Sequence, residues 1–271
     1  MSARSAAGPG PDNKFGFAVA LAAAVLLAGS PSQAWLPETH RIANAVANKN
    51  RESGRAHTLR LEVELRFEGD PEAAATGVLW SDPGGSARLE LVSPKGFIER
   101  HLVRGRRTDA SRDGQLLESA RSFLPPYFLL QATSAGALTN RLLELGVRTG
   151  EATLGYEGEH DCYVIGGRTA NSSAATSRPA TRDAATSTPA LWVDSDAFSV
   201  VRFDSAEGAS FLFGPPLEVD GLTVPAWIEV HAAGEAVARL AVLGAGSATV
   251  APEGFAIGWL RRGPAAAGQM P

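Results

Sequence analysis

The stretch that decides the fold is residues 57–70, which reads HTLRLEVELRFEGD. Every second residue from Leu59 to Phe67 is apolar, and the residues between them are charged. Because successive side chains of a β-strand point to opposite faces, one face of this strand is apolar and the other is charged. The charged face belongs in water, so the question is what covers the apolar face.

The same alternation recurs along most of the chain. In residues 78–94, Leu89 and Leu91 alternate with charged residues, and the turn-forming residues 82–85 join two strands. Further strands are expected in residues 151–168, 191–214 and 221–250. The pattern predicts about ten antiparallel strands in all.

Only two helical segments accompany these strands. Residues 37–54 predict an amphipathic helix, with Ile42 and Val46 four apart and Gly54 as its stop. Residues 118–147 lack period-two alternation, and their double proline prevents one continuous helix. Two short helical elements cannot cover about ten strands. We therefore expect a mainly β (α+β) fold, with a single large curved antiparallel sheet forming an unclosed β-barrel around a cavity, an N-terminal helix and a helical lid.

Two sets of apolar residues are candidates for binding. The expected cavity lining consists of the alternating strand residues Leu59, Leu61, Val63, Leu65, Phe67, Leu89 and Leu91. The expected lid consists of the residues around the double proline, Phe123, Leu124, Tyr127, Phe128 and Leu130. The strand set is also compatible with ordinary core, and the lid set with core or with an exposed patch that binds a partner protein.

The first 34 residues resemble an export signal. Arg4 and Lys14 precede an apolar run at residues 15–28, and small residues at Ser32 and Ala34 follow it. This order predicts a secretory signal peptide cleaved after Ala34. The apolar run is shorter than the roughly 20 residues of a membrane span, although an uncleaved anchor is the alternative. We therefore expect a soluble periplasmic protein.

The rest of the chain is expected to form one domain, residues 35–255. Residues 169–190 are rich in Ala, Ser and Thr with little to bury, so we expect a disordered loop between strands. Residues 256–271 are expected to form a frayed tail.

Several local patterns match one known family. They are LEVELRF, GVLWSDPGGSARLEL, LPPYFLL, YVIGG, LWVDSDAFSVVRFD and VPAWIEV, spread over roughly residues 36–250. The order of a helix, long strands, a proline-containing helical insert and further strands resembles the LolA/LolB superfamily. These are periplasmic carriers and outer-membrane receptors for lipoproteins, and RseB-type envelope-stress sensors share their fold.

The resemblance implies a curved sheet whose concave side binds acyl chains of a lipid or lipoprotein beneath movable helices. It further implies a role in outer membrane biogenesis and a membrane-anchored donor or acceptor protein as partner. One departure matters: the family has an arginine before a proline in the second long strand, where this chain has Asp82. The arginine's role is therefore not carried over. The missing lipid-attachment cysteine near Ala34 favours a soluble carrier over an anchored receptor.

No motif for chemistry stands out. The five histidines show no metal-ligand spacing, and nucleophile elbows and phosphate-binding loops are missing, so we expect no enzyme activity, no metal and no cofactor. A net charge of −4 argues against nucleic acid. Cys162 is the single cysteine, which excludes an internal disulfide, and we expect a monomer. Two alternatives stay open: an envelope sensor or interaction protein with the same fold, and a hydrolase built around His160 and Asp161.

Overall fold

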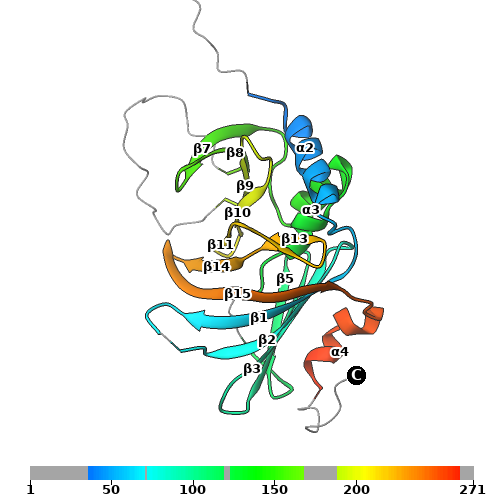
Figure 1. Ribbon diagram of the computed structural model, residues 1–271, viewed down its shortest axis with the longest axis vertical. Coiled ribbons are helices and arrows are strands. Elements are labelled where there is room, and N and C mark those ends of the chain that lie inside the picture. Colours follow the sequence, from blue (N-terminus) through cyan, green and yellow to red (C-terminus); the bar gives the residue numbers. More distant parts are fainter. Residues whose placement is uncertain (1–35, 71, 119–122, 168–187, 263–271) are drawn as a thin grey trace, which may run out of the picture. The chain divides into compact units, whose positions relative to one another are not determined.

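The main element of the structure, a computed structural model, is an antiparallel sheet (Figure 1). Residues 36–70, 72–118, 123–167 and 188–262 are described. The strands are β1 Leu59–Phe67, β2 Ala75–Asp82, β3 Ser86–Val92, β4 Ile98–Arg104, β5 Arg107–Arg112, β6 Gln115–Leu116, β7 Ala152–Glu157, β8 His160–Gly166, β9 Ala190–Asp194, β10 Val200–Asp204, β11 Ala209–Phe213, β12 Pro216–Val219, β13 Leu222–Pro225, β14 Trp227–Ala232 and β15 Glu235–Ser247. The expected signal peptide (1–34) and most of the expected loop (169–190) lie outside the described residues.

The sheet has thirteen strands in the order β6-β5-β4-β3-β2-β1-β15-β14-β11-β10-β9-β8-β7. Its two end strands, β6 and β7, are not paired with each other, so the sheet is unclosed. Strands β12 and β13 form a separate hairpin. The predicted fold class, a single large antiparallel sheet that does not close, is confirmed.

Strand register places apolar residues side by side across this sheet. Leu61 of β1 lies opposite Leu79 of β2. In the other half of the sheet, Phe203 of β10 lies opposite Leu191 of β9 and Phe211 of β11. All five residues belong to one buried cluster. The apolar side chains of distant strands therefore share one face, which the curved sheet presents as its concave side.

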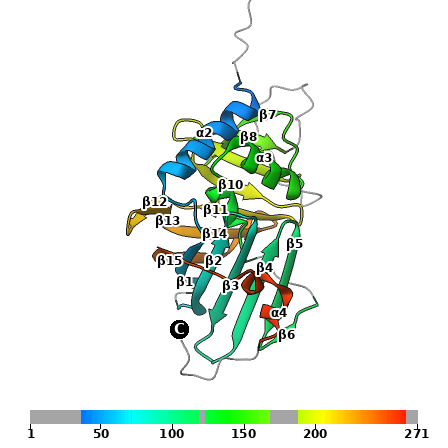
Figure 2. The same ribbon diagram turned by 90° about the vertical axis from the view of Figure 1, so that its right-hand side faces the viewer.

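The middle of the sheet bends at a β-bulge. The register of β1 with β15 shifts between Glu62 and Val63, so that Leu243 has no opposite residue and its side chain is exposed. Bulges increase the local twist of a strand pair. Strands β3–β5 accordingly run in a different direction from β10–β14, as Figure 2 shows.

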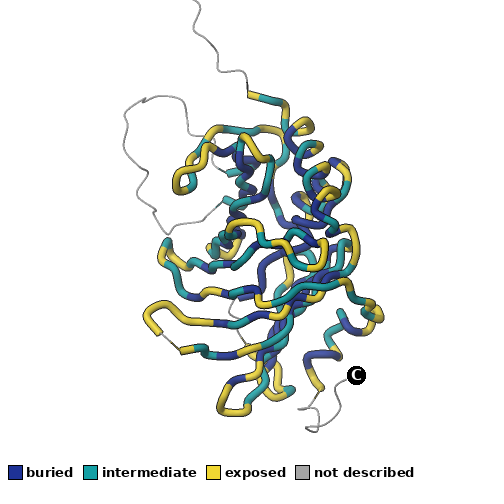
Figure 3. The backbone as a smooth tube through the Cα atoms, in the orientation of Figure 1, coloured by how far each residue is buried: buried dark blue, intermediate teal, exposed yellow. Residues whose placement is uncertain are grey.

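Three helical elements cover part of the apolar face: α2 Thr39–Glu52, η1 Tyr127–Gln131 and α3 Ala135–Glu144. The predicted N-terminal helix is confirmed as α2, which buries Ile42 and Val46, and the chain turns at Gly54 with a φ of +71°. Only glycine adopts such a φ without strain. Figure 3 shows buried residues, in dark blue, where α2 and α3 adjoin the sheet and within the strands away from their ends.

The stretch expected to be a frayed tail contains ordered structure. Helices η2 Pro252–Phe255 and α4 Ile257–Leu260 adjoin β3–β5, and Trp259 and Leu260 are buried against Leu102. The Arg88 guanidinium lies 4.3 Å from the Trp80 ring centroid and 4.9 Å from that of Trp259. Burial of Trp259 and these cation–π contacts order residues 256–262. The helix within them, α4, has four residues and is too short to show periodicity in the sequence.

Candidate functional site

A short helical segment, Phe123–Gln131, lies against the apolar face of the sheet, and we call it the insert. The five residues of η1 are all buried, and Leu124 is 2% exposed. The apolar residues of the insert share one cluster with Leu61 and Leu79 of the sheet. The insert therefore covers part of the apolar face of the sheet: η1 adjoins β2 and β3, and the Phe123 ring lies 5.9 Å from that of Phe67 on β1. This answers in part the question that the alternating sequence raised.

Asn50 on α2 holds the end of the insert. Its Nδ2 atom donates hydrogen bonds to the carbonyl oxygens of Leu129 (3.1 Å) and Ala132 (3.0 Å). Its Oδ1 atom accepts one from Nη2 of Arg55 at 3.1 Å. Carbonyl groups at the end of a helix have no partner within the helix, so Asn50 supplies the donors that these two need.

Gln131 fixes the same end of the insert to the sheet. Its Nε2 atom donates to the carbonyl oxygens of His57 (2.7 Å) and Ser81 (3.2 Å), and its Oε1 atom accepts from the Ser81 hydroxyl at 2.5 Å. Both side chains are fully buried, at 1% or less exposure. Buried polar groups need such partners, so Gln131 and Ser81 satisfy each other.

Asp82 is at the position where the family that the sequence resembles has an arginine. Its hydrogen bonds are to residues at the same end of β1 and β2. Its Oδ2 atom accepts a hydrogen bond from the Thr58 hydroxyl at 2.8 Å, and Oδ1 accepts one from the Gly84 N–H at 2.6 Å. Asp82 therefore stabilises the β2–β3 turn. In this protein the polar side chains that hold the insert are Asn50 and Gln131.

The larger cavity, about 590 Å³, lies beside the insert and opens to solvent. Its wall comes from five places: the end of α2 with the residues that follow it, the insert at Leu130, the β7–β8 turn, the β9–β10 region, and the segment from β11 through the β12–β13 hairpin to Trp227. Apolar side chains predominate, among them Val200, Phe213 and Val224. A volume of this size is within the usual range of small-molecule sites.

The carboxylates that line the larger cavity all have partners. Glu157 forms an ion pair with Arg202 at 2.5 Å, and Glu218 accepts a hydrogen bond from the Thr223 hydroxyl at 2.6 Å. Asp194 accepts hydrogen bonds from His160 and from backbone N–H groups. Burial raises the pKa of Asp194, but these hydrogen bonds outweigh it and lower the pKa overall. Asp194 therefore caps the turn that follows β9.

Arg55 is the unusual member of this lining. Only 7% of its surface is exposed, and within the described residues it forms no ion pair with a carboxylate. Its Nε atom is buried without a hydrogen-bond partner. Burial lowers the pKa of Arg55, and the adjacent Tyr127 hydroxyl opposes this only in part. Burial of Tyr127 raises its own pKa to about 12.

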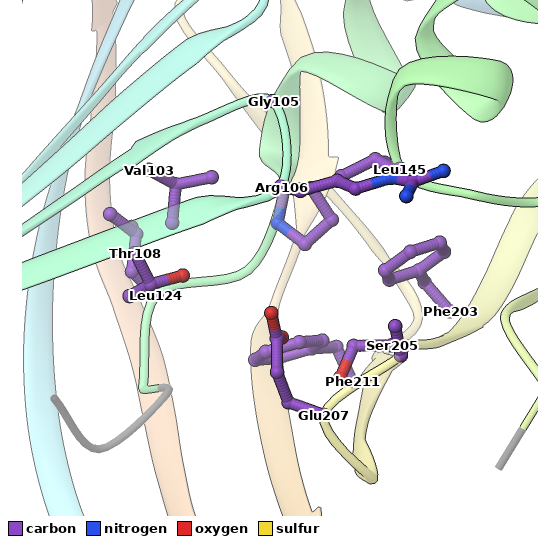
Figure 4. Close-up of a pocket in the computed structure, with 12 residues that line it drawn as sticks. Val103, Gly105, Arg106, Thr108, Leu124, Leu145, Phe203, Ser205, Glu207 and Phe211 are labelled. Carbon is purple, nitrogen blue, oxygen red and sulfur yellow. The ribbon is translucent and has the colours of Figure 1, made fainter. Parts of the chain in front are cut away.

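A smaller cavity, about 30 Å³, lies at the opposite end of the insert and has room for only a few water molecules. Figure 4 shows Val103 and Leu124 on one side of it and Phe203 and Phe211 on the other. These residues come from the β4–β5 and β10–β11 parts of the sheet and from the insert. Leu124 lines the smaller cavity and Leu130 the larger one, so the insert separates the two.

The predicted strand residues do not line either cavity. Those from Leu59 to Leu65, together with Leu89 and Leu91, are buried in the common cluster. Phe67 is 38% exposed, and its ring lies 5.9 Å from that of Phe123. Of the predicted lid residues, all are buried, and Leu124 and Leu130 border the cavities.

Sequence reasoning missed most of the larger cavity. Its wall includes Arg55, Val200, Val224 and Trp227, which come from segments far apart in the chain. A basic residue four positions before the start of an apolar strand was the available signal for Arg55. Nothing in the sequence pattern brings it next to Val224.

A charged cluster also lies on the concave side of β4 and β5. His101 is fully buried, its Nε2 atom lies 2.9 Å from Glu99, and its ring is 5.7 Å from that of Phe123. Arg112 forms an ion pair with the same Glu99 at 2.9 Å. The hydrogen bond with His101 holds the pKa of Glu99 at about 2, although burial opposes this shift.

Among the described residues, no group of three or more His, Cys, Asp or Glu side chains is arranged to hold a metal ion. Cys162 is fully buried, and burial raises its thiol pKa to about 11, which is the opposite of what a reactive thiol requires. None of the described helices is both long enough and apolar enough to cross a membrane.

Comparison with known proteins gave matches among solved structures. The chain is similar to a LolA superfamily protein from Nitrosomonas europaea, with 14% identity, a TM-score of 0.49, and coverage of 83% of this chain and 100% of that one. It is also similar to a DUF1329 family protein from Desulfovibrio piger, with 12% identity, a TM-score of 0.44 and coverage of 83% and 100%. A chain of the Pseudomonas aeruginosa MucA/MucB complex matches with 14% identity, a TM-score of 0.29 and coverage of 87% and 67%.

No protein-family model and no curated protein matches the chain. The first structure carries the name of the superfamily that the sequence resembles, and the unclosed sheet is established by this protein's own strand order. These similarities concern the fold alone.

Proposed function

We propose that the protein is an exported periplasmic carrier that binds acyl chains of a lipid or lipoprotein and exchanges them with a membrane-anchored donor or acceptor protein. Binding, and not catalysis, is its activity. The observation that carries this proposal is the larger cavity of about 590 Å³, which is mainly apolar and borders the insert.

The energetics favour a site that can enlarge. Burying one methylene stabilises by about 0.8 kcal/mol, so about ten methylenes contribute roughly 8 kcal/mol. Association costs on the order of 4–15 kcal/mol, which leaves little net affinity from this cavity alone. More apolar surface becomes available if the insert moves, because Leu61 and Leu89 of the sheet lie beneath it.

The attachment of the insert supports such a movement. Its backbone hydrogen bonds within the described residues are local, from the Tyr127 N–H to Pro125 and from the Leu129 N–H to Pro126. Its polar links to α2 and the sheet are made by the side chains of Asn50 and Gln131. In this proposal the lid is formed by Phe123, Leu124, Tyr127, Phe128 and Leu130. The strand residues that contact the bound chain are Leu59, Leu61, Val63, Leu65, Phe67, Leu89 and Leu91.

Native mass spectrometry of the protein purified from an envelope fraction tests the proposal. We expect a bound lipid or acyl mass that disappears when Val201, at the larger cavity, is replaced by tryptophan. The matched control is Leu243→Trp, which adds the same side chain at an exposed position of the bulge. A lipid-free mass for the wild type, together with no binding of added dodecanoate, would contradict the proposal.

A further inference from the structure

Arg55 raises a question that acyl-chain binding alone does not answer. It lies between α2 and β1, is 7% exposed, and lines the larger cavity. A guanidinium group carries five N–H donors, and the hydrogen bond to Oδ1 of Asn50 uses one of them. Its Nε atom is buried and has no partner.

A buried cation is costly unless an anion neutralises it. The carboxylates that share the cavity with Arg55 are engaged elsewhere: Glu157 with Arg202, Asp194 with His160, and Glu218 with Thr223. Across the described part of the chain, no ion pair of Arg55 is found. The cavity therefore holds a positive charge whose anion the described residues do not provide.

The surroundings of Arg55 combine charge with an apolar wall. Lys49, one turn back from the end of α2, lines the same cavity and adds a second positive charge. Leu130 and Val224 supply apolar surface in the same lining. A planar guanidinium matches the oxygens of a carboxylate or a phosphate, which can accept two parallel hydrogen bonds.

We propose that the larger cavity binds a single-chain amphiphile with an anionic head. The head, a carboxylate or a phosphate, is held by Arg55, and the alkyl chain lies along Leu130 and Val224. This inference rests on the proposed function and adds the chemistry of the head group. Arg55 also donates a hydrogen bond to Asn50, the residue that holds the insert. The bound head is therefore linked to the insert through Arg55 and Asn50.

The test compares four probes with the same twelve-carbon chain, below their micelle concentrations: dodecanoate, dodecyl phosphate, dodecanol and dodecylamine. Affinities are measured on the full chain by displacement of a fluorescent fatty acid. We expect either anionic probe to bind roughly ten- to hundredfold more tightly than dodecanol, and dodecylamine to bind most weakly. The tighter of the two anionic probes identifies a carboxylate or a phosphate ligand.

The variant Arg55→Gln separates head-group recognition from a structural role. It should lose the preference for the anionic probes and keep the wild-type affinity for dodecanol, whereas Arg55→Lys should keep part of the preference. Arg107→Gln, which removes an exposed arginine of β5, is the control and should leave the preference unchanged.

The outcomes distinguish the two proposals. Equal binding of all four probes to the wild type overturns the anionic-head inference and leaves the carrier proposal standing. An equal loss of dodecanoate and dodecanol binding in Arg55→Gln assigns the arginine a purely structural role and also overturns the inference. The comparison of the four probes on the wild type does not depend on whether any variant folds. Failure of every probe to bind contradicts the carrier proposal itself.

Discussion

Replacing Asn50 with alanine should loosen the insert, because this side chain joins α2 to the insert backbone. Asn50 donates to the carbonyl oxygens of Leu129 and Ala132, at 3.1 and 3.0 Å, and accepts from Arg55 at 3.1 Å. Asn50 is 2% exposed. The substitution therefore leaves two carbonyl groups and one guanidinium donor without their partner in a region that water reaches poorly.

The expected loss follows from these three hydrogen bonds. Each neutral bond contributes about 1 kcal/mol, and the bond from Arg55 contributes about 1.5–3 kcal/mol. The free energy of unfolding should fall by roughly 3–5 kcal/mol. For a chain of this size, the melting temperature should fall by roughly 6–20 °C. Alanine has a higher helix propensity than asparagine, which offsets about 0.5 kcal/mol of this loss.

Urea denaturation measures the loss, with Asn44→Ala as the matched control. Asn44 is exposed on the same helix, so its substitution makes the same change in helix propensity at a position away from the insert. Hydrogen exchange at the amides of Leu129 to Ala132 should accelerate in Asn50→Ala alone. If the two variants differ by less than about 0.5 kcal/mol, or exchange at the insert is unaltered, the role assigned to Asn50 is wrong.

Three further changes test other parts of the structure. The pKa of Glu99 is held at about 2, below its ordinary 4.5, so the interaction stabilises above pH 4.5 and is lost as the pH falls toward 2. Urea denaturation of Glu99→Gln should show a deficit on the order of 2 kcal/mol at pH 7, after allowance for solvent screening, that shrinks as the pH approaches 2; a deficit independent of pH would count against this. Cys162, with its pKa raised to about 11 and its side chain buried, should react with an aromatic disulfide reagent at pH 8 only after unfolding, and rapid labelling of the native protein would contradict its burial. Trp259→Ala should lower the free energy of unfolding by about 3 kcal/mol in thermal or urea melts, and an unchanged value would mean that α4 contributes nothing.

The sequence was sufficient to predict which residues face the core. Alternation from Leu59 to Phe67 predicted strand β1, whose buried and exposed residues follow that pattern up to Leu65. Turn residues were equally informative: the predicted turn at residues 82–85 joins β2 to β3, and Gly85 in it has a φ of +101°. Local sequence determines such features because side-chain direction and backbone freedom are properties of neighbouring residues.

Strand neighbours and the cavity wall could not be predicted in the same way. Strand β1 pairs with β15, whose residues lie nearly two hundred positions away, and the pairing is interrupted by a bulge at Leu243. Alternation gives the face of a strand but not its partner or register. Arg55 and Val224 meet in one cavity only because of that long-range pairing, so the candidate site followed from the structure and not from the sequence.

Photo-crosslinking with dodecanoate that carries a diazirine on its chain tests most directly whether the cavity beside the insert binds an acyl chain. The account predicts that the label is found on peptides containing Leu130, Phe213 or Val224, and that excess dodecanoate prevents the labelling. Labelling confined to exposed apolar side chains such as Leu154 and Tyr156, without competition, would contradict it.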